Sequence, residues 1–355
     1  MKVAVLSNIF SDHENKEVED DLLEVGKSVI SALKEYGHEV QFFDVNEKTF
    51  EKLRKANIDI AFNVCERFNG NSFFEPHVAA MLELLGIPYT GSGPLTLALC
   101  MNKVKVKEIL NYYGIPTPKF QVFYSRNKKL SPDLNFPLIV KPMSTDNSIG
   151  INNNSVVNNE KELQARVGYI LRTYNQPALV EEFINGREFA VGVWGNNGTA
   201  QALPISEFVF GEVEPNTYRI LSYEAKWDKE SEIFTKSVEV CPADIPKHLE
   251  SKLKKIALET YRILGIRDYG RIDLRLSDDG TPYVLEMNPN PGISADNTLP
   301  KASQALNVPY SEMIYRIFCI ALDRHGMKYE HTKMSEIAEK NLNPDVESQS
   351  AEQKQ

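Results

Sequence analysis

Two stretches of the chain decide its fold: Gly270-Arg-Ile-Asp-Leu-Arg-Leu276 and Val284-Leu-Glu-Met-Asn-Pro-Asn-Pro-Gly292. In both, apolar and polar residues alternate, which is typical of β-strands with one apolar and one polar face. Asp278-Asp279-Gly280, which lies between them, is typical of a hairpin turn. The sequence therefore predicts two neighbouring antiparallel strands.

The polar face of this expected hairpin gathers oxygen ligands. Alternation puts Arg271 beside Asp273 on the first strand, and it groups Val284, Glu286 and Asn288 on the second. Two carboxylates and an amide oxygen are ligands that suit Mg²⁺. The alternative is an ion-paired face, in which Arg271 binds Asp273 or Glu286. Because the opposite face is apolar and Asn-Pro-Asn-Pro-Gly follows directly, the pattern favours a metal site.

The first hundred residues predict a separate layer. Apolar runs at 2–6, 39–43, 58–63 and 87–90 read as strands, and the amphipathic stretches 18–36 and 73–85 read as helices, the second ending at Gly86. Alternating strands and helices with short connections favour a parallel sheet that helices cover on both faces.

The rest of the chain predicts an α+β arrangement. A first group comprises helices at 102–113 and 160–174 and strands at 136–141 and 178–183, with a loop at 142–150. A second group comprises strands at 187–194, 200–208, 270–276 and 282–288 and helices at 246–264 and 310–324. The polar stretch 331–355 offers little to bury, and we expect it to be a frayed or disordered tail.

Composition limits the classes of function. The chain has 355 residues, of which 42% are hydrophobic and 25% charged, as in globular proteins of two or three domains. A net charge of −9 disfavours a nucleic-acid partner. No apolar run approaches the roughly 18 residues that cross a membrane. The four cysteines are far apart, without metal-ligand spacing, so we expect a cytoplasmic protein.

Lys141 ends an otherwise apolar strand, next to a loop rich in Ser, Thr, Asn and Gly. A lysine in that position needs a charged partner, and a nucleotide phosphate would be one. The alternative is a lysine that extends from an edge strand into solvent. The residues alone leave both interpretations open.

Seven motifs follow one another along the chain: Leu82-Glu-Leu-Leu-Gly-Ile-Pro-Tyr-Thr-Gly-Ser-Gly93, Lys103, Lys141-Pro142, Leu179-Val-Glu181-Glu-Phe-Ile184-Asn-Gly-Arg-Glu188, Tyr223-Glu-Ala-Lys226-Trp227, Gly270-Arg-Ile-Asp273 and Glu286-Met-Asn288-Pro-Asn-Pro-Gly292. The series resembles the ATP-grasp superfamily and, within it, the D-alanine–D-alanine ligase family. The resemblance covers most of residues 1–325.

The resemblance implies an ATP-grasp fold, mixed α/β and α+β, in three parts. Residues 1–100 would form an N-terminal Rossmann-like domain, residues 101–185 a central lid domain, and residues 186–330 the C-terminal domain that grasps ATP, followed by the tail at 331–355. It also implies ATP and two Mg²⁺ ions, which Mn²⁺ can replace, and small-molecule carboxylate and amine substrates. We expect a homodimer without nucleic-acid or membrane partners.

Site roles are carried over from the family by motif. The phosphates would be met by Lys103, Lys141, Ser148 and Lys226. The adenine would be held by Glu181 and the backbone of Glu182, Phe183 and Ile184, and the ribose by Glu188. The metal ligands would be Asp273, Glu286 and Asn288. Developing negative charge would be stabilised by Arg271 and the Gly292 N–H, and the first substrate's amine would meet Glu17, with Glu14 and Glu19 as alternatives. The second substrate would meet Asp296, Asn297 and Thr298.

The reaction that the resemblance implies is ligation. ATP would convert a carboxylate into an acyl phosphate, and an amine would displace the phosphate, leaving ADP and phosphate as by-products. The alternatives are a true D-alanine–D-alanine ligase, a kinase-like enzyme that does not ligate, and a nucleotide-binding protein without activity.

The chain departs from the family where amino acids would bind. Residues 64–75 replace the family's His-Gly…Gly-Glu-Asp-Gly stretch, and Asp296-Asn297-Thr298 stands in place of His-Ser-Leu. The motifs that face ATP match, while those that face the amino acids differ. We therefore expect poor activity with two D-alanines.

Overall fold

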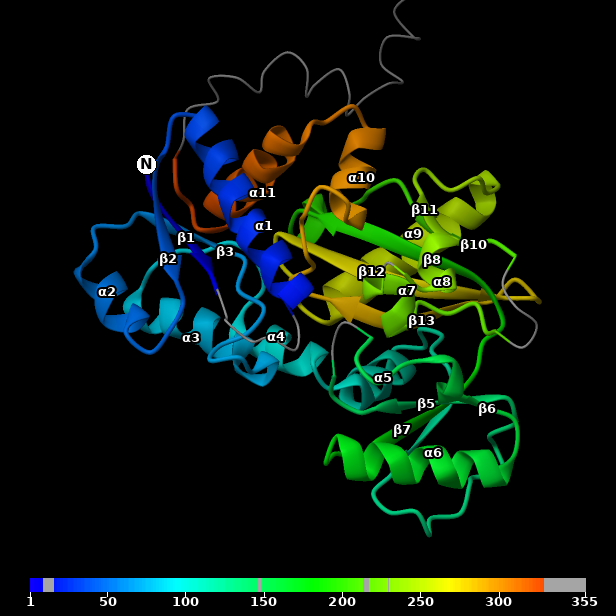
Figure 1. Ribbon diagram of the computed structural model, residues 1–355. Helices are drawn as coiled ribbons and strands as arrows, with labels where there is room; N and C mark the ends of the chain where they lie inside the picture. The colour runs from blue at the N-terminus through cyan, green and yellow to red at the C-terminus, as the bar shows by residue number, and fades with distance from the viewer. Residues whose placement is uncertain (9–15, 146–147, 213–216, 229, 329–355) are drawn as a thin grey trace, which may run out of the picture.

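The computed structural model describes residues 1–8, 16–145, 148–212, 217–228 and 230–328, and the side chains of residues 16–23 and of Trp227 are outside the description. Three sheets organise these residues (Figure 1). In that view the C-terminal sheet lies to the right of the N-terminal sheet and above the central sheet. Parallel and antiparallel pairing both occur, which confirms the mixed fold class.

The N-terminal sheet is parallel, in the order β2-β1-β3 (Glu39–Asp44, Lys2–Ser7, Ile60–Asn63). Val3 and Val5 pack with α1 (Lys16–Glu35) and α11 (Tyr310–Arg324). Ala4 and Leu6 face the other side, where α2 (Thr49–Lys55) and α3 (Glu75–Leu85) lie. Successive β1 residues therefore feed two separate cores, and the prediction of a parallel sheet covered on both faces is confirmed.

The expected fourth strand at residues 87–90 is wrong. Tyr89 forms only an isolated bridge to Ala61. Its carbonyl oxygen accepts a hydrogen bond from Arg324 Nη2 at 2.6 Å, and its N–H lies 3.2 Å from His325 Nε2. Ala61 bonds to the Pro88 carbonyl and the Thr90 N–H at 2.8 and 3.0 Å, so residues 88–90 meet β3 at this one bridge and do not continue as a strand.

The central sheet is antiparallel, in the order β4-β7-β5-β6 (Phe120–Phe123, Ala178–Glu182, Leu138–Pro142, Val156–Val157). Helix α6 (Glu160–Thr173) covers one face through Leu163, Val167 and Ile170. Asn159 begins α6, because its side chain accepts the backbone N–H of Glu162. The short strand β4, of four residues, was not expected from the sequence.

The C-terminal sheet runs β11-β10-β8-β12-β13 (Ser237–Val240, Ser206–Phe210, Gly186–Trp194, Tyr269–Ser277, Pro282–Asn288). Its apolar face packs on α9 (Lys247–Ile263) and α5 (Lys103–Tyr112). The strand expected at 200–208 is two strands, since β9 (Gln201–Ala202) pairs only with β8 and ends before Pro204, which has no N–H to donate.

The hairpin of β12 and β13 forms as predicted, but with a bulge. Asp273 pairs with Glu286 and Leu274 pairs with Val284, so Leu285 is an extra residue. One extra residue reverses the alternation beyond it. Val284 consequently joins the apolar cluster with Met287, and its expected place beside Glu286 is wrong.

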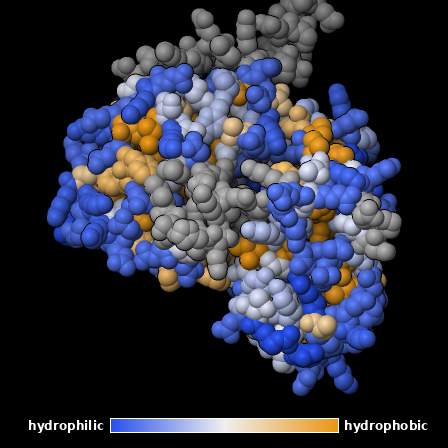
Figure 2. All heavy atoms as spheres, in the orientation of Figure 1, coloured by the Kyte–Doolittle hydropathy of each residue, from blue (hydrophilic) through white to orange (hydrophobic). Residues whose placement is uncertain are grey.

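The remaining helices are short connections: α4 (Pro94–Cys100), α7 (Tyr223–Trp227), α8 (Glu232–Thr235), α10 (Thr298–Ala305) and the 3₁₀ turns Ser72–Phe74, Asn153–Ser155 and Asn197–Thr199. No helix among the described residues is long and apolar enough to cross a membrane. Hydrophobic residues form only small groups among hydrophilic ones on the face shown in Figure 2.

A buried carboxylate joins the first and last parts of the chain. Asp268 is fully buried, receives two hydrogen bonds from Arg324 of α11, at 2.9 and 2.7 Å, and accepts the Gly91 N–H at 2.8 Å. Helix α11, which belongs to the expected C-terminal domain, therefore packs against the N-terminal sheet. The division of the chain at residues 100, 185 and 330 stays a prediction, and the tail at 331–355 lies outside the described residues.

Candidate active site

The polar face of β12 and β13 brings the three expected metal ligands together. Asp273 lies directly opposite Glu286, and Arg271 lies opposite Asn288. The Asn288 amide nitrogen donates to Asp273 Oδ2 at 3.1 Å. The bulge keeps the polar face continuous here, because it falls after the Asp273–Glu286 pair. Two carboxylates and one amide therefore share one surface.

Both carboxylates have cationic partners in the structure. Arg271 donates from Nε and Nη2 to the two oxygens of Asp273 at 2.7 and 2.9 Å. Lys103 Nζ, from the first turn of α5, lies 2.7 Å from Glu286 Oε1. The ion-paired arrangement that the sequence left open is thus formed between Arg271 and Asp273. The same oxygens fit a hard cation that would exchange places with these positive groups.

The local charges keep Glu286 ionised. Burial raises the pKa of its carboxyl, but the ammonium groups of Lys103 and, more weakly, Lys226 outweigh burial and lower the pKa to about 2. For Arg271, burial lowers the pKa of the guanidinium, and the Asp273 carboxylate more than reverses this effect. Glu286 is therefore ready to bind a cation at neutral pH.

The polar face of β12 and β13, with Asp273, Glu286 and Asn288, is called the metal face after the ligands expected there. A buried charge cluster lies next to it, at the central sheet. Glu181 receives Lys107 Nζ at 2.9 Å and Lys141 Nζ at 2.8 Å on its two oxygens. Lys107 also donates to Thr117 Oγ1 at 2.7 Å, and Thr117 donates to the Val284 carbonyl of β13 at 2.9 Å. This chain of contacts joins β7 of the central sheet to β13 of the C-terminal sheet.

Lys107 was not among the site residues expected from the sequence. The available signal was its spacing from Lys103, because residues four apart lie on the same face of a helix. Burial raises the pKa of Glu181, but Lys107 and Lys141 together outweigh burial and lower it to about 2. Lys141 thus has a carboxylate partner in the structure, and its contact with phosphate stays a prediction.

The elements expected to hold the adenosine lie at the ends of β7 and β8. The backbone N–H groups of Glu182 and Phe183 donate to the Lys119 and Pro137 carbonyls at 3.0 Å. These two N–H groups therefore hold the end of β7 to the segments beside it. Ile184 follows them in the loop before β8. Glu188 is buried and pairs with Arg275 at 3.0 Å, and burial raises the pKa of its carboxyl.

Two described segments carry the remaining residues expected at the phosphates, Ser148 and Lys226. Ser148, with φ of 59°, donates from Oγ to the Leu221 carbonyl at 2.8 Å. Lys226 lies in α7, which Ser222 caps. Lys103 Nζ also donates to the Thr145 carbonyl. Asp146 and Asn147 lie outside the described residues.

The expected amino-acid residues lie at the loop after β13. A Cβ atom on Gly292 would approach Asn297 Nδ2 to 2.7 Å, so a larger residue there would displace the Asn297 side chain. Asn297 begins α10, Thr298 is buried in its first turn, and Asp296 is exposed. The side chain of Glu17, in α1, and that of Glu19 are outside the description, as is the whole of Glu14.

Asn290, which sequence analysis did not single out, holds this loop in place. Its amide nitrogen donates to Glu75 Oε1 and to the Cys65 carbonyl, both at 2.9 Å. Its amide oxygen accepts the Tyr269 hydroxyl at 2.6 Å. The second asparagine of Asn-Pro-Asn-Pro-Gly therefore connects the Gly292 loop to Cys65, just after β3, and to the start of α3.

Comparison with known proteins decides the family. The family described as "D-ala D-ala ligase C-terminus" matches residues 109–319. The chain is 33% identical over 295 residues to D-alanine–D-alanine ligase of Bordetella petrii, covering 82% of this chain and 85% of that one. The chain belongs to the D-alanine–D-alanine ligase family. The family and fold predicted from the motifs are both confirmed.

Other comparisons agree with this assignment. The crystal structure of D-alanine–D-alanine ligase from Bacillus anthracis complexed with ATP superimposes with a TM-score of 0.71 at 26% identity, covering 92% of this chain and 99% of that chain. A protein of Sinorhizobium fredii named y4sG is 36% identical over 309 residues, covering 85% of this chain and 88% of that protein. This member of the family is thus an ATP-grasp ligase.

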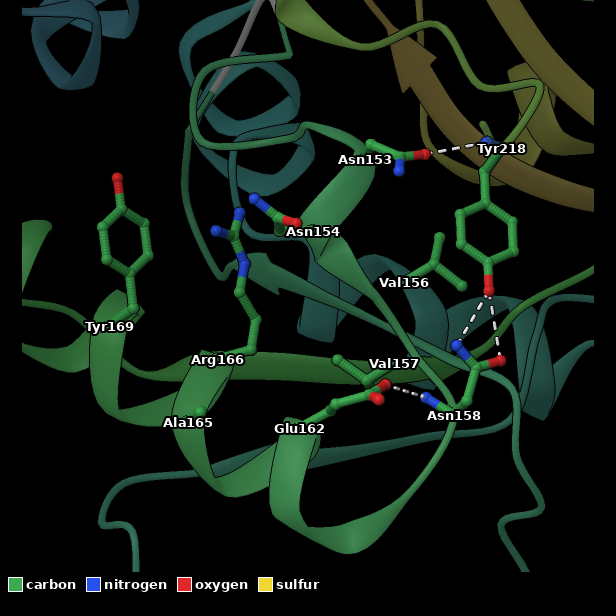
Figure 3. Close-up of a pocket in the computed structure, with 10 residues that line it drawn as sticks. All are labelled: Asn153, Asn154, Val156, Val157, Asn158, Glu162, Ala165, Arg166, Tyr169 and Tyr218. Atoms are coloured by element: carbon green, nitrogen blue, oxygen red, sulfur yellow. Dashed lines mark hydrogen bonds between the residues drawn. The ribbon is translucent and has the colours of Figure 1, made fainter. Parts of the chain in front are cut away.

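One cavity of this ligase is lined by residues other than the expected metal ligands. It encloses about 530 Å³ at the edge of the central sheet, between β6, α6 and Tyr218 (Figure 3). A second hollow of about 360 Å³ lies beside α4. Neither includes Asp273 or Glu286, so cavity size alone does not locate the site, and the geometry of the charged groups does.

The two low pKa values predict sensitivity to acid. Glu181 and Glu286 ionise near pH 2 in the fold, below the ordinary 4.5, so the unfolded chain binds more protons between these values. The stability that these two carboxylates contribute is therefore fully present above pH 4.5 and is lost as the pH falls towards 2. Each carboxylate contributes a slope of up to about 1.4 kcal/mol per pH unit.

Urea unfolding at several pH values between about 2.5 and about 7 gives the free energy of unfolding at each pH and so measures this slope. In the Glu286→Gln variant the slope should decrease by up to about 1.4 kcal/mol per pH unit, the contribution of one carboxylate. An identical slope in both proteins would contradict the low pKa of Glu286.

Proposed function

We propose that this ligase activates a carboxylate with ATP and Mg²⁺ and joins it to an amine. The observation that carries the proposal is the convergence of Asp273, Glu286 and Asn288 on one face, with Lys103 at Glu286. Mg²⁺, as two ions that Mn²⁺ can replace, would neutralise phosphate oxygens and so make the terminal phosphate easier to transfer.

The lysines of the site would bind the phosphates of ATP. Lys103 and Lys141 are each paired with a carboxylate in the structure, and a phosphate would take over part of that pairing. Lys226 would approach from α7 and Ser148 from its loop. Glu181 with the backbone at 182–184 would hold the adenine, and Glu188 the ribose hydroxyls.

The ligation step builds negative charge twice, in the acyl phosphate and in the tetrahedral intermediate that the amine forms. Arg271 would stabilise this charge from the metal face, and the Gly292 N–H would do so from the loop. Glu17 would hold the amine of the first substrate. Closing the site would keep water from the acyl phosphate.

Phosphate release tests this function. A carboxylic acid and an amine supplied together should release phosphate much faster than either alone. ADP formation with the acid alone, without phosphate release, would indicate a kinase-like enzyme, and neither ADP nor phosphate with any pair would indicate a nucleotide-binding protein without activity.

The substrate prediction concerns Asp296. We expect two D-alanines to be a poor pair, and a second substrate that is larger or differently charged to be preferred, because a carboxylate in the pocket repels the carboxylate of alanine. Asp296 is exposed, so solvent screens this repulsion. Asp296→Asn should raise the rate with two D-alanines a few-fold.

Asp278→Asn, in the exposed hairpin turn, is the matched control and should leave that rate unchanged. Efficient synthesis of D-alanyl-D-alanine by the unaltered enzyme, faster than any other pair, would contradict the prediction. It would favour a true D-alanine–D-alanine ligase.

We also propose a homodimer and a cytoplasmic location. Leu84 of α3 and Leu95 of α4 are 80% and 81% exposed on neighbouring helices, which supports an interface there. All four cysteines are free, which fits a reducing compartment. Light scattering coupled to gel filtration tests the oligomeric state.

A further inference from the structure

The segment that leads into α7 lies against a sheet to which it does not belong. Along the chain it connects β10 and β11 of the C-terminal sheet. Ile220, however, is 4% exposed and packs with Ile139 of β5 and Val156 of β6, both in the central sheet. A side chain from one half of the ATP-grasp fold is therefore buried in the other half.

Tyr218 adds polar and aromatic contacts beside this apolar one. Its N–H donates to Asn153 Oδ1 at 2.8 Å, and its hydroxyl lies 2.8 Å from Asn158 Nδ2. Its ring meets Phe183 edge-on, with centroids 5.3 Å apart. Figure 3 shows Tyr218 beside the pocket, with Asn153 near its backbone and Asn158 at its hydroxyl.

The next residues reach the loop that carries Ser148. Ser148 Oγ donates to the Leu221 carbonyl at 2.8 Å, and the Tyr223 N–H donates to the Ile151 carbonyl at 3.0 Å. Helix α7 begins at Tyr223, and Lys226 lies within it. Loop 148–151 and α7 are thus attached to each other as well as to the central sheet.

Helix α7 needs this attachment to have a defined position. A helix of five residues is too short to be stable alone, because the conformational entropy lost in forming the first turn exceeds what its few hydrogen bonds contribute. Its place is therefore set by what its flanking residues contact. The Lys226 ammonium acts electrostatically on both Glu286 and Glu188, so α7 lies within range of the metal face.

We propose that Ile220 and Tyr218 are positioning residues that dock the Lys226 segment onto the central sheet, so that Lys226 and the Ser148 loop approach the phosphates together. The inference rests on the proposed function, because it assigns Lys226 to the phosphates. It adds the residues that hold Lys226, and neither of them is among the residues expected to contact the substrates.

Trypsin tests the docking without requiring ligation, because it cuts after Arg219 and Lys226. In Ile220→Ala and in Tyr218→Ala, cutting at these two sites should be about tenfold faster, since local opening exposes the segment. Cutting after Lys128 and Lys129, in an exposed turn between β4 and β5 of the central sheet, should be unchanged. Loss of global stability would instead accelerate both places together.

Kinetics test the positioning. In the same variants kcat should fall about tenfold, because Lys226 is misplaced, while KM for ATP should change less than about threefold. Tyr218→Phe and Ile220→Val keep the ring contact and most of the apolar contact, and should restore both readouts. Tyr124→Phe, at a tyrosine that is 70% exposed, is the control.

Two results would overturn the proposal: unchanged cutting and kcat in the alanine variants, or a rise in cutting that is equal at Lys128 and Lys226. If the unaltered enzyme released no phosphate with any substrate pair, the proposed function would fail. The cutting pattern would still decide whether Ile220 and Tyr218 dock the segment.

Discussion

Replacing Glu286 by glutamine should lower kcat about 100- to 1,000-fold, the range seen when one group that stabilises transition-state charge is removed. Glutamine keeps the shape of the side chain but removes the charge that a Mg²⁺ ligand needs. It also leaves Lys103, 2.7 Å away in the native site, without its carboxylate. The measurement is phosphate release at saturating ATP and substrates.

Glu108→Gln is the matched control, because Glu108 forms an exposed ion pair with Lys105 on α5. This variant should keep its full activity. Circular dichroism and the melting temperature of Glu286→Gln would show that the fold is intact. Wild-type turnover in a folded Glu286→Gln protein would show that Glu286 does not bind the metal.

Replacing Lys107 by methionine should lower the free energy of unfolding by about 3 kcal/mol, a typical cost of removing one partner of a buried ion pair. Methionine fills the volume of the lysine stem, so the loss comes from the charge. Lys107 and Glu181 side chains are 2% and 1% exposed, and water cannot replace the missing partner. Urea unfolding at pH 7 measures the change.

Nucleotide binding should weaken in the same variant, because Lys107 orients the Glu181 carboxylate expected at the adenine. Lys105→Met, two residues away on an exposed face of α5, is the control and should leave both quantities unchanged. The double variant Lys107→Met, Glu181→Gln should not regain this stability, since Lys141, which is also paired with Glu181, then loses its carboxylate. A fully stable Lys107→Met protein would contradict this account.

The sequence identified the metal face through local chemistry. Asp278-Asp279-Gly280 predicted the turn, and alternation predicted that Asp273 would meet Glu286 across the hairpin. Both depend on residues close together along the chain, so no long-range information was needed. The family motifs extended this prediction to the ATP-grasp fold, which the comparisons confirm.

Other local patterns led to wrong elements. The apolar run at 87–90 has the composition of a strand, yet it bonds to β3 only at Ala61, and the other backbone groups of Tyr89 bind Arg324 and His325, more than 230 residues away. The bulge at Leu285 moved Val284 to the apolar face, because alternation cannot show where one residue is extra. Which strand a residue meets is a property of the assembled sheet.

The sequence by itself therefore determined the polar face of β12 and β13, the parallel N-terminal sheet and the motifs for ATP. Tertiary structure alone decided that Lys107 joins Glu181 to Thr117, that Asn290 connects the Gly292 loop to Glu75, and that Ile220 is buried in the central sheet. The physical reason is range. Side-chain periodicity and turn chemistry act over a few residues, whereas a buried charge or an apolar anchor finds its partner only after distant segments have packed together.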